Sequence, residues 1–409
     1  MNEITKLKIL TVNCVFEKGS TGRIIMDIAT NLSSKCNFIF CYETGPASKG
    51  NNYRIASKNE QRFYYILARV LGLKYSTGFT STYRLISFIK KQNPDIVHLH
   101  CPNVNTVNIP WLISFLKKQN IPTVITNHAE FYYTGNCPHA YDCLKFQTGC
   151  GNCNYVFDPY RRYLFDRTTH EWKLMKGAFE NNKNVIMVAV SPWVQERMKL
   201  SPITNALNSY TIKNGINTDI FNFRGENARN KLGLPKDKKI VLQVTANFTD
   251  EKNDLKGGRY VIELAKRMKN TLFIVIGTVR IKNPENLSEN IKILGNTDNQ
   301  NLLAEYYSAA DLTIITSKRE TYGMACAESL SCGTKVVGFK AGGPESISMP
   351  DASEFVEYGN IDALEECIKK NADGIYDKKN LSDRAVNIYS SKTMADNYYE
   401  IYCRAVGGK

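Results

Sequence analysis

The sequence predicts an α/β protein with two doubly wound domains, each built on a parallel sheet. Short apolar segments of strand length alternate with segments that are apolar at helical spacing, and this alternation ends near residue 215 and resumes near residue 222. Such alternation is typical of parallel sheets covered by helices on both faces. The length of 409 residues fits two to three domains of about 150 residues each.

In the first domain, residues 1–215, the strands predicted in chain order are 8–13, 38–42, 96–100, 123–127 and 185–190. The helices predicted between them are 23–32, 83–91 and 110–119. Two such domains facing across a cleft bring two ligand crevices together, which favours a reaction between two bound molecules.

In the second domain, residues 222–388, the predicted strands are 239–245, 271–276, 290–294, 312–316 and 334–338. The predicted helices are 258–268, 302–310 and 323–331. Residues 223–238 are polar with Gly and Pro, which predicts a connection. The segment 389–409 predicts a C-terminal helix that packs back on the first domain.

The composition excludes a mostly disordered chain, because 43% of the residues are hydrophobic and 22% are charged. The net charge of +14 favours acidic partners, which are nucleic acid, anionic lipid or phosphorylated small molecules. No apolar run reaches the roughly 18 residues that cross a bilayer, and no signal peptide is visible. We therefore expect a cytoplasmic protein, soluble or peripheral on the inner face of the cell membrane.

The strongest motif is SKRETYGMACAE, residues 317–328, which follows a predicted strand and opens a helix. Glu320 lies in the loop and Glu328 lies in the helix, while Gly323 allows close approach to the backbone. Amide groups at a helix start can hold a diphosphate, and carboxylates can accept hydrogen bonds from ribose or sugar hydroxyls. The alternative is a capped helix preceded by a solvated acidic loop.

This motif, together with AGGPES at 341–346, resembles the donor site of glycosyltransferase family four, which comprises retaining enzymes of the GT-B fold. The resemblance covers nearly the whole chain. NGINTDIF at 214–221 is similar to the end of the family's first domain, and SAADLTIITS at 308–317 is similar to its strand before the glutamates. Lys256-Gly257 resembles the family's Lys-Gly signature.

The resemblance implies that the first domain, 1–215, binds the acceptor and that the second, 222–388, binds the nucleotide sugar. It also implies a role for each matching residue. Lys256 would neutralise the diphosphate leaving group, Glu328 would bind the ribose, and Glu320 would bind the hydroxyls of the transferred sugar. The implied donor site also includes Gly22, Lys252, Tyr322, Gly323 and Met324. Fixed donors aimed at a departing diphosphate lower the barrier, so no cofactor is implied for catalysis.

The chain departs from the family at one position, since the arginine expected about five residues before Lys256 is absent. Lys252 is the nearest basic residue in register and either substitutes for it or leaves that phosphate contact weaker. Without the resemblance, Lys256 would be read as a solvated lysine at a helix start.

Three histidines end predicted strands of the first domain. His98 and His100 end one strand, and His128 ends the next. A lone histidine at a strand end is more often structural. His128, however, resembles the family's active-site histidine, which contacts the donor sugar from the first domain and is counted here as catalytic. Gly22 lies in the loop after the first strand, and Arg23 follows it at the next helix start, where it could add a phosphate contact.

Four of the 12 cysteines form a cluster inside an insertion at about 135–155. Cys137, Cys143, Cys150 and Cys153 follow the pattern C-x5-C-x6-C-x2-C. Thiolates at short spacing, with a final CxxC pair, suit a tetrahedral structural zinc ion. Four free thiols and an iron–sulfur site are the alternatives. A similar Cys-rich insertion marks some polysaccharide-assembling members of the family.

Residues 158–180 mix basic residues with Tyr, Leu, Phe and Trp and predict an amphipathic helix. Such a helix either lies on an anionic membrane surface or packs against the core with a solvated basic face. The sequence does not decide between these two.

The resemblance to the family therefore implies a retaining hexosyltransferase that moves a sugar from a nucleoside-diphosphate sugar to an acceptor hydroxyl. The expected acceptor is a lipid-linked glycan of a capsule, exopolysaccharide or O-antigen. Two alternatives stay open: a GT-B enzyme acting on a small soluble acceptor, and a basic zinc-containing nucleic-acid-binding or regulatory protein. The latter would show a nucleic-acid-reading element, which is not recognisable here.

Overall fold

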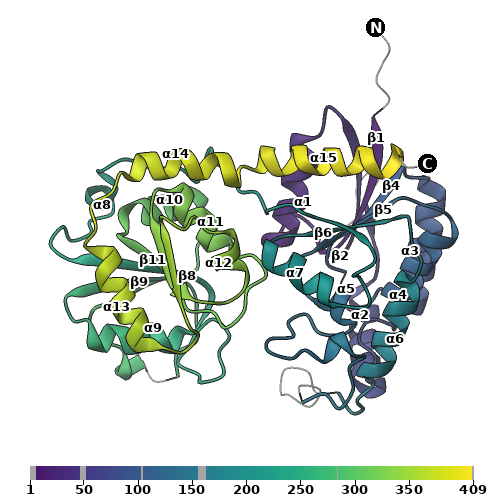
Figure 1. The fold of residues 1–409 in the computed structure, drawn as a ribbon, viewed down its shortest axis with the longest axis horizontal. Helices are drawn as coiled ribbons and strands as arrows, with labels where there is room; N and C mark the ends of the chain where they lie inside the picture. Colours follow the sequence, from purple (N-terminus) through teal and green to yellow (C-terminus); the bar gives the residue numbers. More distant parts are fainter. Residues whose placement is uncertain (1–5, 47–51, 103–104, 155–162, 283, 408–409) are drawn as a thin grey trace, which may run out of the picture. The chain divides into compact units, whose positions relative to one another are not determined.

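The computed structural model describes residues 6–46, 52–102, 105–154, 163–282 and 284–407. The chain forms two compact units. Unit 1 comprises residues 1–213 together with 394–409, and unit 2 comprises residues 214–393. Each unit is a parallel sheet covered by helices on both faces (Figure 1), so the predicted fold class is confirmed.

Unit 1 contains a seven-stranded parallel sheet in the order β3-β2-β1-β4-β5-β6-β7. Its strands are β1 (Leu7–Val15), β2 (Cys36–Thr44), β3 (Tyr53–Arg54), β4 (Ile96–Leu99), β5 (Thr123–Asn127), β6 (Val185–Ala189) and β7 (Asn208–Thr211). Its helices are α1 (Gly19–Asn31), α2 (Lys58–Leu71), α3 (Phe79–Gln92), α4 (Ile109–Lys118), α5 (Phe131–Thr134), η1 (Lys145–Gln147), α6 (Thr168–Phe179), α7 (Pro192–Leu200) and most of α15 (Ser391–Gly407).

Unit 2 contains a six-stranded parallel sheet in the order β10-β9-β8-β11-β12-β13. Its strands are β8 (Lys239–Phe248), β9 (Thr271–Val279), β10 (Ile291–Gly295), β11 (Leu312–Ile315), β12 (Lys335–Phe339) and β13 (Ser353–Val356). Its helices are α8 (Ala228–Lys231), α9 (Gly258–Arg267), η2 (Pro284–Asn286), α10 (Gln300–Ala309), α11 (Met324–Ser331), α12 (Gly343–Ile347), α13 (Ile361–Ala372) and α14 (Lys378–Tyr389).

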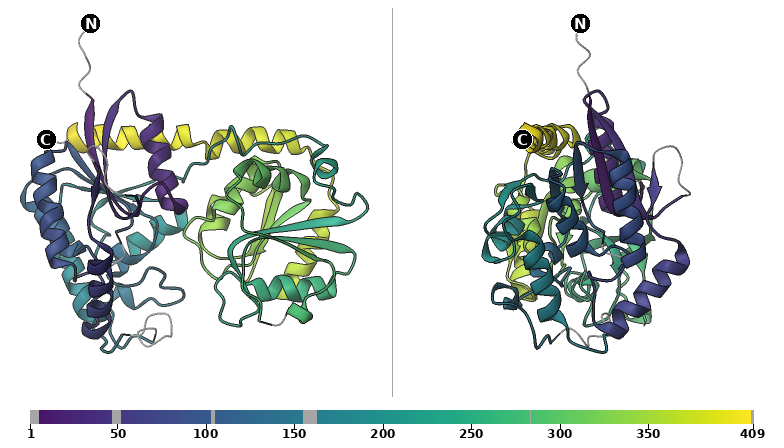
Figure 2. Two further views of the ribbon diagram at one scale, coloured as in Figure 1. Left: turned by 180° about the vertical axis from the view of Figure 1, so that it is seen from behind. Right: turned by 90° about the vertical axis from the view of Figure 1, so that its right-hand side faces the viewer.

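Apolar burial fixes the two faces of the second sheet. Helices α9 and α13 pack on one face, where Val261, Leu264 and Leu364 meet Phe273 and Val337 in a buried cluster. Figures 1 and 2 show α10 and α11 on the other face. With both faces covered, the polar groups that follow the strands remain at the carboxyl edge, where doubly wound folds bind ligands.

The C-terminal helix belongs to unit 1 over most of its length. Tyr402 and Tyr398 of α15 are fully buried, and their hydroxyl groups hydrogen-bond to His98 Nδ1 at 2.8 Å and to Thr126 Oγ1 at 2.9 Å. These contacts attach α15 to strands β4 and β5. Two strand-end residues of unit 1 are therefore held by a helix that is about 270 to 300 positions away in the chain.

The prediction of a helix over 158–180 is wrong about where the helix begins. Residues 158–162 lie outside the described residues, and residues 163–167 are not helical. Helix α6 begins at Thr168, whose backbone N–H and hydroxyl both donate to Asp166 Oδ1, at 3.0 and 2.6 Å. A carboxylate in this position satisfies a free donor of the first turn of the helix.

Helix α2 was not anticipated, although the sequence carries its start signal. Ser57 and Glu60 form a reciprocal capping box, and Gly72 ends the helix in the left-handed conformation.

Among the described residues, no helix has both the length and the apolar character needed to cross a bilayer.

Candidate functional site

Lys256 and Glu320 form an ion pair at the carboxyl edge of the unit 2 sheet. Lys256 lies in the loop after β8, and Glu320 lies in the loop after β11, which is hydrogen-bonded to β8. The chain order reverses between these two strands, and doubly wound sheets bind ligands at such a switch point. The side chains are 33% and 24% exposed, so a ligand can reach both.

The backbone around Lys256 is tightly fixed. Its carbonyl oxygen accepts a hydrogen bond from Thr316 Oγ1 at 2.8 Å, which ties the β8 loop to the end of β11. Gly257 has φ +71°, and a Cβ there would lie 2.2 Å from the carbonyl oxygen of Thr316. Only glycine fits, because the conformation is left-handed and the space is closed. The Lys-Gly pair therefore positions the ammonium group through its glycine.

The Glu320 loop is held at both of its sides. Glu320 N–H donates to the carbonyl of Ala341 at 3.0 Å, and its own carbonyl accepts from Gly343 N–H at 2.8 Å. Ser317 Oγ donates to the carboxylate at 3.0 Å. The AGGPES segment predicted to belong to the site thus supports Glu320 directly. Within that segment, Glu345 accepts the N–H groups of Ala341 and Gly342 at 3.0 and 2.7 Å.

Gly323 caps the start of α11 with φ +90°, and Met324 is the first residue of that helix. The first amide groups of any helix lack acceptors within the helix. The α11 start therefore presents N–H groups next to the loop that carries Glu320. Glu328 lies in the second turn of α11 and accepts a hydrogen bond from the buried Tyr307 hydroxyl at 2.9 Å. Burial raises the pKa of Tyr307, which keeps this hydroxyl a donor.

Two further members of the predicted donor set behave differently. Tyr322 is buried, and its hydroxyl donates to the carbonyl of Asn214 at 2.6 Å, which is a structural contact within unit 2. Lys252 is exposed in the loop between β8 and α9, beside Asp250, Asn253 and Lys282. The structure gives Lys252 no contact to the Lys256–Glu320 pair.

In unit 1, three histidines form a stack at the ends of β4 and β5. His100 Nδ1 and His128 Nε2 share a hydrogen bond of 3.0 Å, and the rings of His98 and His100 are 3.8 Å apart. His98 bonds through both ring nitrogens, to Tyr402 and to Thr126 Oγ1 at 2.8 Å each. His98 is therefore structural, whereas His100 is the direct partner of His128.

Burial keeps these rings neutral. It lowers the pKa of His98 to about 3 and that of His128 to about 4. The pKa of His100 lies well below its usual value because of burial and the two neighbouring imidazoles. At neutral pH the stack offers hydrogen-bonding groups without positive charge.

Gly22 lies in α1, close to the loop that follows β1. A Cβ there would come within 3.3 Å of the Glu17 backbone, so the small residue lets the loop turn tightly onto the helix. Arg23 is exposed beside it.

The Cys-rich loop follows α5 and is tied to the rest of unit 1 by main-chain contacts. Glu130 accepts Ala140 N–H at 2.7 Å, and Asp166 accepts Cys153 N–H at 2.7 Å. Burial raises the pKa of Cys150 to about 12, and the neighbouring charges of Cys137, Cys143 and Cys153 act in the same direction. In the part of the chain that the structure describes, however, no three His, Cys, Asp or Glu side chains converge on a metal position. The zinc site stays a prediction.

The resemblance named Lys256 and Glu320 as site residues, but it did not predict their ion pair or the groups that hold the site residues in place. Ser317 and Tyr307 orient the two glutamates, and His100 orients His128. The sequence signals for them are weak, because a serine near the end of a strand or a tyrosine in an amphipathic helix is common without any such role.

Comparison with family models matches both units. Residues 21–220 match the model described as Glycosyltransferase Family 4, and residues 225–385 match the model described as Glycosyl transferases group 1. A curated relative, the D-inositol 3-phosphate glycosyltransferase of Thermomonospora curvata, is 33% identical over 133 residues, which cover 29% of this chain and 31% of the relative. The chain thus matches about a third of the length of the curated relatives.

Solved structures share the fold over almost the entire chain. Sucrose-phosphate synthase from Thermosynechococcus elongatus superposes with a TM-score of 0.71 at 16% identity, covering 99% of this chain and 100% of that chain. HepE of Anabaena, solved in complex with UDP-glucose, gives a TM-score of 0.61 at 14% identity, covering 97% and 99%. At these identities the likeness establishes the fold alone.

Proposed function

Because the chain belongs to the family-four glycosyltransferases of the GT-B fold, we propose that it transfers a sugar from a nucleoside-diphosphate sugar to an acceptor hydroxyl. The observation that carries the proposal is the partly exposed ion pair of Lys256 and Glu320 at the sheet's switch point. The ammonium would meet the diphosphate of the donor, and the carboxylate would meet sugar hydroxyls.

The proposed chemistry uses fixed charge and leaves no step to a metal. Negative charge grows on the diphosphate as the glycosidic bond breaks, and Lys256 with the α11 amide groups would stabilise it. Glu328 would accept the ribose hydroxyls, and neutral His128 would contact the donor sugar. The departing phosphate would help to deprotonate the acceptor on the same face, so the anomeric configuration is retained and no protein base is needed.

The proposed acceptor is a lipid-linked glycan at a membrane surface. The Cys-rich loop that resembles the insertion of polysaccharide-assembling members supports it, as does the surplus of positive charge. A small soluble acceptor is the second candidate, because the names of the Thermomonospora relative and of sucrose-phosphate synthase refer to small phosphorylated or sugar molecules.

The test measures nucleotide release from a panel of UDP-, GDP- and ADP-sugars to find the donor. The measurement is then repeated with that donor and each class of acceptor. We expect Lys256→Met to lose about 10²- to 10³-fold in kcat. Lys370→Met is the matched control, since Lys370 also pairs with a glutamate in unit 2 but lies near the end of α13, at the edge of the sheet where β8 begins and opposite the site loops. Equal rates for the two variants, or no donor turned over by the unaltered protein, would refute the proposal. Proton NMR of the product reports its anomer, and EDTA should leave the rate unchanged.

We also propose a structural zinc ion on Cys137, Cys143, Cys150 and Cys153, supported by four thiols in one short loop that influence one another electrostatically. Metal analysis should find about one zinc per chain, and Cys143→Ser should lower it while Cys36→Ser, a buried cysteine of β2, should not. Absence of zinc from the unaltered protein would leave four free thiols.

A further inference from the structure

Helix α2 carries an apolar ridge on its outer face. Phe63, Ile66 and Val70 are 59%, 61% and 42% exposed, and their spacing of three and four residues aligns them along one side of the helix. The opposite side packs inward through the buried Tyr64 and Ala68. The ridge is therefore not needed to hold α2 on unit 1, and it exposes apolar area to solvent.

A neighbouring segment extends this ridge. Leu164 and Phe165 are 64% and 55% exposed. Leu164 N–H donates to the carbonyl of Arg69 at 3.0 Å, and the left-handed Gly72 lets the Phe165 carbonyl approach the end of α2 closely. Two chain segments almost a hundred residues apart thus form one surface. We call Phe63, Ile66, Val70, Leu164 and Phe165 the apolar patch.

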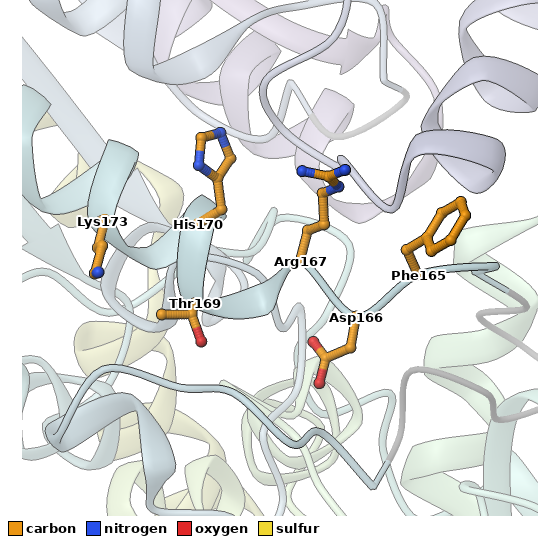
Figure 3. Close-up of a pocket in the computed structure, with 6 residues that line it drawn as sticks. All are labelled: Phe165, Asp166, Arg167, Thr169, His170 and Lys173. Atoms are coloured by element: carbon orange, nitrogen blue, oxygen red, sulfur yellow. The ribbon is translucent and has the colours of Figure 1, made fainter.

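Basic side chains border the apolar patch. Arg62 and Arg69 flank the ridge on α2, and Arg167 and Lys173 follow Phe165 around a shallow pocket at the start of α6. Figure 3 shows Phe165, Arg167 and His170 directed to one side of the ribbon and Asp166 and Thr169 to the other. Asp166 is engaged with Thr168 and Cys153, so its charge is already bonded within the protein.

We infer that the apolar patch with its basic border docks unit 1 onto the surface of a bilayer that contains anionic lipid. Large apolar side chains enter the boundary between headgroups and acyl chains, and arginine and lysine at that depth meet lipid phosphates. The inference rests on the proposed function, because an acceptor anchored in a membrane must be reached from the bilayer surface.

The basic border argues against a second copy of the chain as the occupant. In a two-fold symmetric contact the same patch appears on both sides, so the bordering cations would face one another. Like charges brought together at an interface are unfavourable. An anionic surface is complementary to the same cations, and the net charge of +14 acts in the same direction.

The experiment is flotation of the full chain with vesicles of phosphatidylcholine, with and without phosphatidylglycerol. We expect binding to the vesicles that contain phosphatidylglycerol and weaker binding at high salt. Ile66→Asp and Phe165→Ser should each weaken binding about tenfold, and Arg62→Gln about fivefold. Ile375→Asp is the matched control, since Ile375 is fully exposed in unit 2, and should bind as the unaltered protein does.

Several results would overturn the inference. One is no flotation at low salt, and another is equal binding by Ile66→Asp and Ile375→Asp. A third is a dimer in sedimentation that Ile66→Asp converts to monomer with vesicle binding unchanged. Because flotation needs no donor sugar, vesicle binding without nucleotide release would refute only the proposed function, and nucleotide release without vesicle binding would refute only the docking surface.

Discussion

The carboxyl edges of the two sheets differ in the kind of polar group that they carry. Unit 2 presents an ion pair, Lys256 with Glu320, whose side chains are partly exposed. Unit 1 presents His98, His100 and His128, which burial holds neutral. The same doubly wound architecture thus places charge at one edge and uncharged hydrogen-bonding groups at the other. This difference fits the proposed reaction, in which negative charge develops on the diphosphate of the donor while the transferred sugar and the acceptor hydroxyl are uncharged groups.

The largest effect on kcat should come from the carboxyl edge of the unit 2 sheet, where Lys256 and Glu320 lie. Glu320→Gln keeps the shape of the side chain but removes the negative charge that pairs with Lys256 and that we propose to meet the sugar. We expect kcat to fall about 10²-fold, measured as nucleotide release. Glu354→Gln removes the partner of Lys370 in the same unit and should leave kcat unchanged. An equal loss in both variants would mean that the charge of unit 2 acts at long range rather than in the site.

A change in the backbone that holds Lys256 in place should have the next largest effect, on the stability of unit 2. Gly257→Ala places a Cβ against the Thr316 carbonyl at φ +71°, so we expect unit 2 to lose about 3 kcal/mol of unfolding free energy. Gly225→Ala has a similar φ of +85° but meets nothing within 4 Å, so it should lose only about 1 kcal/mol. Equal losses would show that backbone conformation, and not the closed space, makes Gly257 necessary.

The two units can be followed separately in that experiment. Trp111, Trp172 and Trp193, all in unit 1, are the three tryptophans of the chain, so tryptophan fluorescence reports unit 1 while circular dichroism reports both units. Gly257→Ala should shift the circular dichroism transition in denaturant and leave the fluorescence transition where it was. A shift in both would indicate that the units unfold together.

The sequence predicted unit 2 better than unit 1 for a physical reason. Lys256, Glu320 and Gly323 lie in short loops after buried strands, where the charge and the glycine must occupy fixed positions, so motif and structure coincide. The partner of His128 is 28 residues away on another strand, and α15 reaches His98 across 304 positions. Such contacts depend on strand register, which spacing in the sequence does not reveal.

The apolar patch escaped prediction for a related reason. Residues 58–71 carry apolar side chains on two sides of one helix, and the sequence alone does not tell which side packs inward. The helix predicted over 158–180 also obscured Leu164 and Phe165, which the structure places in a non-helical segment before α6. Burial therefore decides the assignment, because it separates Tyr64 and Ala68 from Phe63 and Ile66.

The buried, neutral histidines of unit 1 should make the free energy of unfolding depend on pH. The folded pKa of His98, about 3, lies below the unfolded value near 6.5, so as the pH falls below 6.5 the unfolded chain binds a proton that the folded chain does not. The free energy of unfolding should fall by about 2 kcal/mol between pH 6.5 and pH 5 for this histidine, followed by tryptophan fluorescence in urea. His98→Gln should make that dependence shallower, leaving the part that His100 and His128 contribute, and His170→Gln, at an exposed position, should leave it unchanged.

The smallest effect is expected for Tyr322, and it distinguishes a structural role of this tyrosine from a contact with the nucleotide sugar. Tyr322→Phe removes the hydroxyl that donates to the Asn214 carbonyl at 2.6 Å and leaves that carbonyl without this donor. We expect a loss of about 1 kcal/mol in unfolding free energy, seen by circular dichroism, and an unchanged KM for the donor. A raised KM at unchanged stability would place the Tyr322 hydroxyl against the donor instead, and would add an uncharged group to the edge that is otherwise defined by Lys256 and Glu320.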